Sequence, residues 1–385
     1  MTEAEAHTLS ARQCSIDQTC ITNKNPTLRG YHLKKPLRKE GEMTARFYKN
    51  LIAQPLCSLL GLVVFFGSAQ VSTAASGDPW IEGAKKEGEV ILYASMNLEE
   101  ANAMISRFEQ KYPFVKVKLN RTDSEKLLTK ILAEARAKKS FADVIQTLGF
   151  AMHTLKKSQH LGHYLGAENG NYPKEFKEEG YWTTVYTNPY VVAYNPRLVT
   201  KETVPRRYED LLHPMWKGKM MMEPTKVDWF GGVLQLMGRE KGLNYMRELA
   251  KQNIMNRIGH DLIAQLVAAG EASLDIDIPA PSVDRVRKRG APIDWVAFPP
   301  VPASLIGIGI SSQPLHPNAA RLYVDFALSM EGQKILADLG RYLARLEFMQ
   351  EQMAKAKGLQ MIPVNPELGE NIVEYAKQMR EIFGQ

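Results

Sequence analysis

The chain has 385 residues, of which 49 are Lys or Arg and 42 are Asp or Glu, giving a formal net charge of +7. Basic residues are interspersed with acidic ones, so the composition gives no support for nucleic-acid binding. The three cysteines, Cys14, Cys20 and Cys57, all precede residue 75, so the rest of the chain offers no disulfide, thiolate metal ligand or cysteine nucleophile. That remaining length has room for two domains.

Residues 43–75 have the order of features typical of an export signal. Arg46 and Lys49 make a basic start, residues 56–66 form an apolar run, and residues 71–76 are small enough for a cleavage site. The run is shorter than the about 20 residues that a membrane span needs. We therefore expect a soluble periplasmic protein after cleavage, with a buried core helix as the alternative for this run.

Residues 1–42 are polar and show no core pattern. Met43 stands where a signal peptide of ordinary length would begin. We expect this segment to be either a disordered extension or a stretch upstream of the true start.

The next part of the chain alternates strand and helix patterns. Apolar residues at 90–94 predict a strand buried on both faces, and the periodicity at 98–112 predicts a helix that Pro113 ends. A strand at 115–119, an amphipathic helix at 124–139 and a strand at 142–146 follow. This βαβαβ order predicts a parallel sheet with right-handed crossovers.

A second α/β series follows a loop-rich stretch. The patterns predict four strands, at 190–194, 219–223, 273–278 and 306–310, and helices at 231–250, 261–269, 318–329 and 331–339. The Pro-rich segment 296–302 is expected to be a connector. Glycines within 306–310 indicate close approach of another backbone. The tail 346–385 is expected to be helical and to pack on the second lobe.

Ten short motifs in a fixed order resemble those of solute-binding proteins of ATP-binding-cassette importers, in the iron(III)-type branch. The resemblance spans residues 78–345. The main matching pieces are VILYAS at 90–95, Ala142-Asp143-Val144, VVAYNP at 191–196, Pro214–Lys219 (PMWKGK), KRGAP at 288–292, and His316–Ala320.

The resemblance implies an α/β fold of the type II periplasmic binding protein class, with two Rossmann-like lobes, a two-crossing hinge and a ligand cleft. Lobe 1 would comprise 76–190 plus 305–330, and lobe 2 would comprise 191–304 plus 331–385. The resemblance also implies a monomer that closes on a small-molecule solute and delivers it to the permease and ATPase subunits, without catalysis.

Iron-binding members of this branch use a His, a carboxylate and a tyrosine pair. By the resemblance, these positions fall on Asn97, near Leu148, and on Ala280-Pro281. None of these residues supplies the anionic oxygens that ferric iron requires. We therefore expect an organic or oxyanionic solute; ferric iron held by a non-standard ligand set is the alternative.

The expected ligand-binding residues lie at the carboxyl ends of predicted strands or on the crossing strand, where helix N-termini also present N–H groups. They are Ser95, Asn97, Thr147, Tyr190, Thr225, Asp228, Trp229, Asp277 and Ser282.

Several of these residues have an alternative interpretation. Ser95, Asn97 and Asp228 suit helix N-caps, Trp229 suits a core, and Asp277 suits a solvated strand edge.

Two other classes of function remain open. An exported hydrolase would need a nucleophile, but Ser311-Ser312 lies in no G-x-S-x-G elbow. His160 and His163 have an H-x-x-H spacing without further zinc ligands. A periplasmic ligand sensor on the same fold is the other alternative. We predict no catalytic residue, metal ligand or cofactor.

Overall fold

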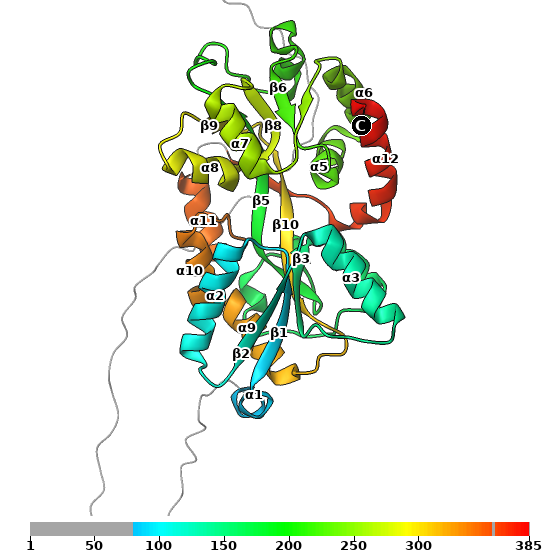
Figure 1. Cartoon of the computed structure of the whole chain (residues 1–385), viewed down its shortest axis with the longest axis vertical. Coiled ribbons are helices and arrows are strands. Elements are labelled where there is room, and N and C mark those ends of the chain that lie inside the picture. The colour runs from blue at the N-terminus through cyan, green and yellow to red at the C-terminus, as the bar shows by residue number, and fades with distance from the viewer. Residues whose placement is uncertain (1–79, 356–358, 385) are drawn as a thin grey trace, which may run out of the picture. The chain divides into compact units, whose positions relative to one another are not determined.

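The computed structural model describes residues 80–355 and 359–384 (Figure 1). The predicted extension 1–42 and signal peptide 43–75 lie outside these residues. No helix within the described ranges is long and apolar enough to span a membrane.

The first lobe is built on the predicted βαβαβ unit. Strand β1 (Glu89–Ala94) pairs in parallel with β2 (Lys116–Arg121) on one side and with β3 (Val144–Leu148) on the other. The prediction of a parallel sheet is confirmed. Its helices are α1 (Ile81–Glu87), α2 (Leu98–Lys111), α3 (Ser124–Arg136), α4 (Gly149–Lys157) and α9 (Pro317–Leu328).

The second lobe has the same kind of architecture. In it, β6 (Met220–Met222) lies between β7 (Met255–Asn256) and β8 (Leu274–Pro279), parallel to both. The helix predicted over 231–250 is two helices, because Gly238 adopts a φ of +81° and ends the first one. The helices of this lobe are α5 (Val227–Met237), α6 (Arg239–Ala250), α7 (His260–Ala269), α8 (Ala280–Lys288) and α12 (Ile372–Phe383).

Two long strands run through both lobes. Residues 183–189 of β5 (Trp182–Tyr194) pair with β10 (Val301–Ile310), and residues 190–194 pair with β8 and β9 (Asp294–Val296). The far end of β10 pairs with β3. Two short strands, β4 (Lys177–Glu178) and β11 (Met361–Pro363), join the edges of this pair. The predicted double crossing is therefore made by β5 and β10, which pass between the labelled groups of elements in Figure 1.

The C-terminal region is divided between the lobes. Leu336 of α10 (Met330–Asp338) and Leu343 belong to the core of the first lobe, and part of α11 (Leu346–Lys355) packs on that core. Tyr375 and Met379 of α12 belong to the second core. The expected boundary at residue 330 is thus too early. The apolar face of α10 packs on α9 and α2, so the chain returns to the second lobe only after α11.

The glycine-rich strand predicted at 306–310 packs as closely as expected. A Cβ atom on Gly309 would lie 2.4 Å from the carbonyl oxygen of Tyr181. Replacement by alanine should lower the free energy of unfolding by about 1–3 kcal/mol, since overpacking forces the backbone apart.

Urea unfolding followed by tryptophan fluorescence measures this effect. Gly170→Ala is the matched control, because no atom lies within 4 Å of a Cβ built there. Equal unfolding midpoints for Gly309→Ala and Gly170→Ala would contradict the packing described.

Candidate functional site

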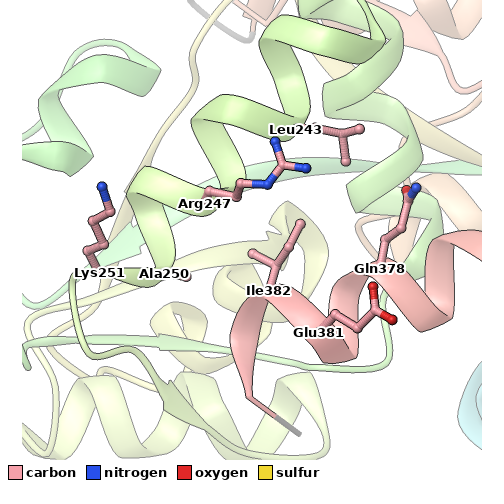
Figure 2. Close-up of a pocket in the computed structure, with 7 residues that line it drawn as sticks. All are labelled: Leu243, Arg247, Ala250, Lys251, Gln378, Glu381 and Ile382. Carbon is pink, nitrogen blue, oxygen red and sulfur yellow. The ribbon is translucent and has the colours of Figure 1, made fainter.

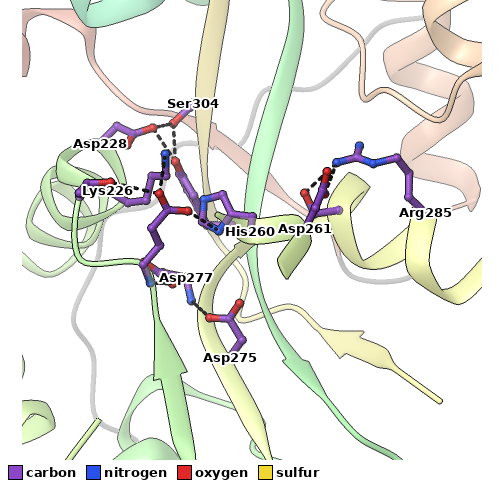
Figure 3. Close-up of polar contacts among 12 residues, drawn as sticks. Lys226, Asp228, His260, Asp261, Asp275, Asp277, Arg285 and Ser304 are labelled. Atoms are coloured by element: carbon purple, nitrogen blue, oxygen red, sulfur yellow. Dashed lines mark hydrogen bonds and ion pairs between the residues drawn. The ribbon is translucent and has the colours of Figure 1, made fainter. Parts of the chain in front are cut away.

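The carboxyl ends of the parallel strands in the second lobe bring together a group of ionisable side chains. Glu223 follows β6, His260 begins α7 after β7, and Asp275 and Asp277 alternate with apolar residues along β8. Residues two apart on a strand share a face. Both aspartates therefore point to the same side of the sheet. We call Glu223, His260, Asp275 and Asp277 the acid cluster (Figure 3).

The acid cluster is tightly connected. The Glu223 N–H donates to Asp277 Oδ1 at 3.0 Å and to Oδ2 at 3.2 Å, and the Asp277 N–H donates to Asp275 Oδ1 at 3.4 Å. Ligand-type atoms of His260, Asp275 and Asp277 all lie within 4.8 Å of one another. Both aspartates are 0% exposed, so Asp277 lies in the sheet interior and the solvated-edge alternative is wrong.

Burial shifts the pKa values of the acid cluster. Burial raises the pKa of the Asp275 carboxyl to about 7, and burial together with Asp275 raises that of Asp277 well above its usual range. Burial and the Lys226 ammonium hold the pKa of His260 well below its usual value. Burial acts to lower the pKa of Lys226, but the carboxylates around it, Glu223 first, raise it. These shifts favour the neutral forms of the Asp277 carboxyl and the His260 imidazole, as expected for ionisable groups buried side by side.

A second polar group joins the two crossing strands to α5. The Tyr190 hydroxyl of β5 donates to Asp228 Oδ2 at 2.5 Å, and the Ser304 hydroxyl of β10 donates to the same oxygen. Burial and the Asp228 carboxylate raise the pKa of Tyr190 well above its usual value. Asp228 lies within the first turn of α5, whose N-cap residue is Lys226, so the N-cap alternative for Asp228 is wrong. We call Tyr190, Asp228 and Ser304 the hinge triad (Figure 3).

One arginine packs on Tyr186 of β5, and the charges of two others, one from each lobe, also act on this residue. The Arg341 guanidinium lies 4.4 Å from the centre of the Tyr186 ring and forms an ion pair with Glu100 at 2.6 Å. Burial raises the pKa of Tyr186 to about 12, while the charges of Arg341, Arg285 and Arg121 oppose the rise. Arg121 ends β2 in the first lobe and Arg285 lies on α8 in the second. Positive charges of both lobes thus act on a tyrosine of the crossing strand β5.

The predicted residues of the first lobe have separate structural roles. Asn97 is the N-cap of α2, with its side chain accepting from the Glu100 N–H at 2.9 Å, so the capping alternative is confirmed. The Ser95 N–H donates to the Gln146 carbonyl at 3.0 Å, just beyond β1. Thr147 is fully buried within β3 opposite Gly307. Solute contact by these residues remains a prediction.

The predicted residues of the second lobe divide into two groups. Thr225 is exposed and donates to Glu223 Oε1 at 3.1 Å, and Ser282 accepts from Arg285 at 3.0 Å, so both border charged groups. Trp229 is 2% exposed within the second hydrophobic core. Core packing accounts for its position, and the structure corrects its assignment to the ligand site.

Several residues near the site were missing from the predicted set of ligand-binding residues. Ser304 was detectable as a polar residue in an otherwise apolar strand, and His260 as the residue before a predicted helix. Arg341 had no local signal, because its partner Glu100 is 241 residues away.

The described surface also contains cavities away from the acid cluster. A groove of about 530 Å³ lies between α6 and α12, and Figure 2 shows the side chains lining it, among them Arg247 and Glu381. Its lining mixes aliphatic and charged side chains, and the Oε1 atom of Gln378 is buried there without a hydrogen-bond partner among the residues that the structure describes. A cavity of about 440 Å³ lies between the two lobes and is lined by Asp284 and Trp295 from one side and by Arg341 and Tyr342 from the other. Its volume is in the range of small-molecule sites.

Comparisons with known proteins agree with this architecture. The model of a family described as bacterial extracellular solute-binding protein matches residues 139–359. A curated relative, the Fe(3+)-binding periplasmic protein of Serratia marcescens, is 24% identical over 174 residues. That match covers 43% of this chain and 51%, about half, of the relative.

Solved structures share the fold over most of the chain. Iron-bound HitA from Pseudomonas aeruginosa has a TM-score of 0.68 at 22% identity, covering 76% of this chain and 99% of that one. AfuA from Actinobacillus pleuropneumoniae, with fructose-6-phosphate bound, has a TM-score of 0.63 at 24% identity, covering 77% of this chain and 97% of that one. At these identities the likeness establishes the fold alone.

The hydrogen bonds of the hinge triad predict that removing the Tyr190 hydroxyl lowers the stability of the protein. Tyr190→Phe removes one of the two hydroxyl donors to a carboxylate that is 6% exposed. The free energy of unfolding should fall by about 1–3 kcal/mol, because the charge loses a partner that water cannot replace.

Chemical denaturation of the variant tests this prediction. Tyr194→Phe on the same strand is the control, because Tyr194 is only partly buried and lies outside the triad. A loss no greater for Tyr190→Phe than for Tyr194→Phe would show that the triad does not stabilise the crossing.

Proposed function

The chain belongs to the family of bacterial extracellular solute-binding proteins, and from this premise we propose that it captures a small organic anion in the periplasm for an importer of the ATP-binding-cassette type. The solute lies between the lobes, and the permease and ATPase subunits are the partners. The protein acts as a monomer and by binding, without catalysis.

The convergence of arginines from both lobes carries the proposal. Arg341 is fixed by Glu100, and Arg285 is held by Asp261 at 2.6 Å. Arg121 is the most exposed of the three, at 41%; its Nε donates to the Met96 carbonyl at 3.1 Å, and its ion pair with Asp123 is long, 3.9 Å. A guanidinium presents several donors in the plane that a carboxylate or phosphate group accepts.

Helix N-termini add to this positive potential. α2 begins at the carboxyl end of β1, and α7 and α8 begin beyond β7 and β8. The first N–H groups and the aligned dipole of α2 favour an anion at this edge of the first-lobe sheet, whereas the acid cluster occupies the corresponding edge of the second. The AfuA structure, which holds fructose-6-phosphate, supports the view that this fold accommodates an organic anion.

Hinge closure provides the signal to the importer. The lobes are joined by β5 and β10, and a solute that contacts both lobes stabilises the closed arrangement relative to the open one. Arg121 and Arg285 belong to different lobes, so an anion that both contact has this differential effect.

Ferric iron is not favoured as the solute. In the iron(III)-type branch, three positions supply iron ligands, and this chain has other residues there. Asn97 is a helix cap, Leu148 precedes α4, and Ala280 is buried in the first turn of α8. None offers an anionic oxygen.

A thermal-shift screen tests the solute class. Sugar phosphates, phosphonates, carboxylates, amines and ferric citrate are compared on the purified protein. An organic anion should raise the melting temperature by mass action, and ferric citrate should give no iron-dependent visible band. A response confined to amines, or a ferric charge-transfer band, would contradict the proposal.

Arg121→Gln should then weaken binding of the anion identified at least about tenfold, which corresponds to about 1.4 kcal/mol. Arg107→Gln is the matched control, since Arg107 is a comparably exposed arginine that pairs with Glu331 on the surface. Calorimetric titration measures both, and equal affinities would remove Arg121 from the site.

A further inference from the structure

We propose that His260, Asp275 and Asp277 form a binding site for one divalent transition-metal ion, with Glu223 as a fourth ligand. The site lies wholly in the second lobe and is separate from the iron positions of the resembling branch, at Asn97, Leu148 and Ala280. It does not depend on the identity of the proposed solute.

The spacing of the ligand atoms suits one ion. Ligand atoms of the three residues lie within 4.8 Å of one another. Two ligand atoms of a tetrahedral zinc ion are about 3.4 Å apart, since each bond is about 2.1 Å long. A shift of about 0.7 Å by each atom of a pair therefore brings the side chains onto a common ion.

A second observation, independent of the spacing of the ligand atoms, is that buried polar atoms of these side chains lack hydrogen-bond partners among the described residues. Within the described part of the chain, Asp275 Oδ2 has no hydrogen-bond partner, although Asp275 is 0% exposed. Neither ring nitrogen of His260 has one either, and the side chain of His260 is 13% exposed. Buried polar atoms without partners are costly, and a cation bound here would satisfy both side chains at once.

Glu223 is placed to complete the ligand set. Its Oε2 lies 3.4 Å from His260 Nδ1. The other oxygen, Oε1, accepts from Thr225 and lies 3.4 Å from the Lys226 ammonium. Lys226 and the ion therefore take different oxygens of one carboxylate.

The donor set selects the class of ion. One imidazole with two or three carboxylates suits Zn²⁺, Mn²⁺ or Fe²⁺, whereas Mg²⁺ and Ca²⁺ prefer oxygen ligands alone. The ion would offset the repulsion among the buried carboxylates on the wall of the second lobe.

The test measures metal directly, without solute. EDTA-treated protein is titrated with Zn²⁺, Mn²⁺, Mg²⁺ and Ca²⁺ by calorimetry, and with Co²⁺ by visible absorption. We expect one Zn²⁺ or Mn²⁺ per chain, a Co²⁺ ligand-field spectrum, and a rise in melting temperature of about 4 °C at saturating metal. The thermal-shift screen of solutes is run separately on metal-free and on metal-loaded protein. Failure of the metal site and failure of the proposed solute class are therefore detected independently.

His260→Gln and Asp277→Asn should each reduce affinity at least tenfold and abolish the Co²⁺ spectrum. Asp261→Asn is the control, because Asp261 adjoins His260 but its side chain is 64% exposed and pairs with Arg285. Circular dichroism confirms that each variant is folded. Wild-type protein that takes up no more Zn²⁺ than folded His260→Gln, or that binds Mg²⁺ as well as Zn²⁺, overturns the proposal.

Discussion

The antiparallel pairing of β5 with β10 is the constraint on which the rest of this structure depends. β5 pairs with strands of both lobes, and β10 pairs with β5 and with β3 of the first lobe, so the two lobes are joined through the same two strands. The chain between them builds the second lobe as a nearly independent α/β unit. Polar residues on these strands, Tyr190 and Ser304, meet Asp228 where the lobes join. The junction of the lobes therefore contains a buried carboxylate held by both crossing strands.

Charge is distributed unequally around this connection. The second lobe buries Glu223, Asp275 and Asp277 close together, whereas Tyr186 is packed against Arg341 and feels the charges of Arg121 and Arg285. The first arrangement favours a cation and the second favours an anion. A site for a cation and a site for an anion can both exist in this protein. The acid cluster is buried within the second lobe, whereas the Arg121 side chain is exposed on the first.

Local sequence patterns predicted most of the fold. Alternation of Asp275 and Asp277 with apolar residues predicted the strand, and the motif order predicted the two-lobed class. Asn97 was predicted both as a cap and as a ligand-binding residue, and the structure supports the cap. Trp229 was misassigned because a tryptophan beside an aspartate looks alike in a core and at a binding site. The acid cluster was only partly predictable, since His260 reaches it through the position of β7. The place of Arg341 beside Tyr186 was not predictable, because its partner Glu100 is 241 residues away in the sequence.

The central claim is that the two lobes close on a solute held between them. Spin labels at Lys126→Cys on α3 and at Ile258→Cys before α7 report the distance between the lobes, since these residues lie in different lobes and are exposed. Pulsed electron–electron double resonance should show that distance shortening when the solute found by the screen saturates the protein. A distance distribution that is the same with and without bound solute would contradict the account.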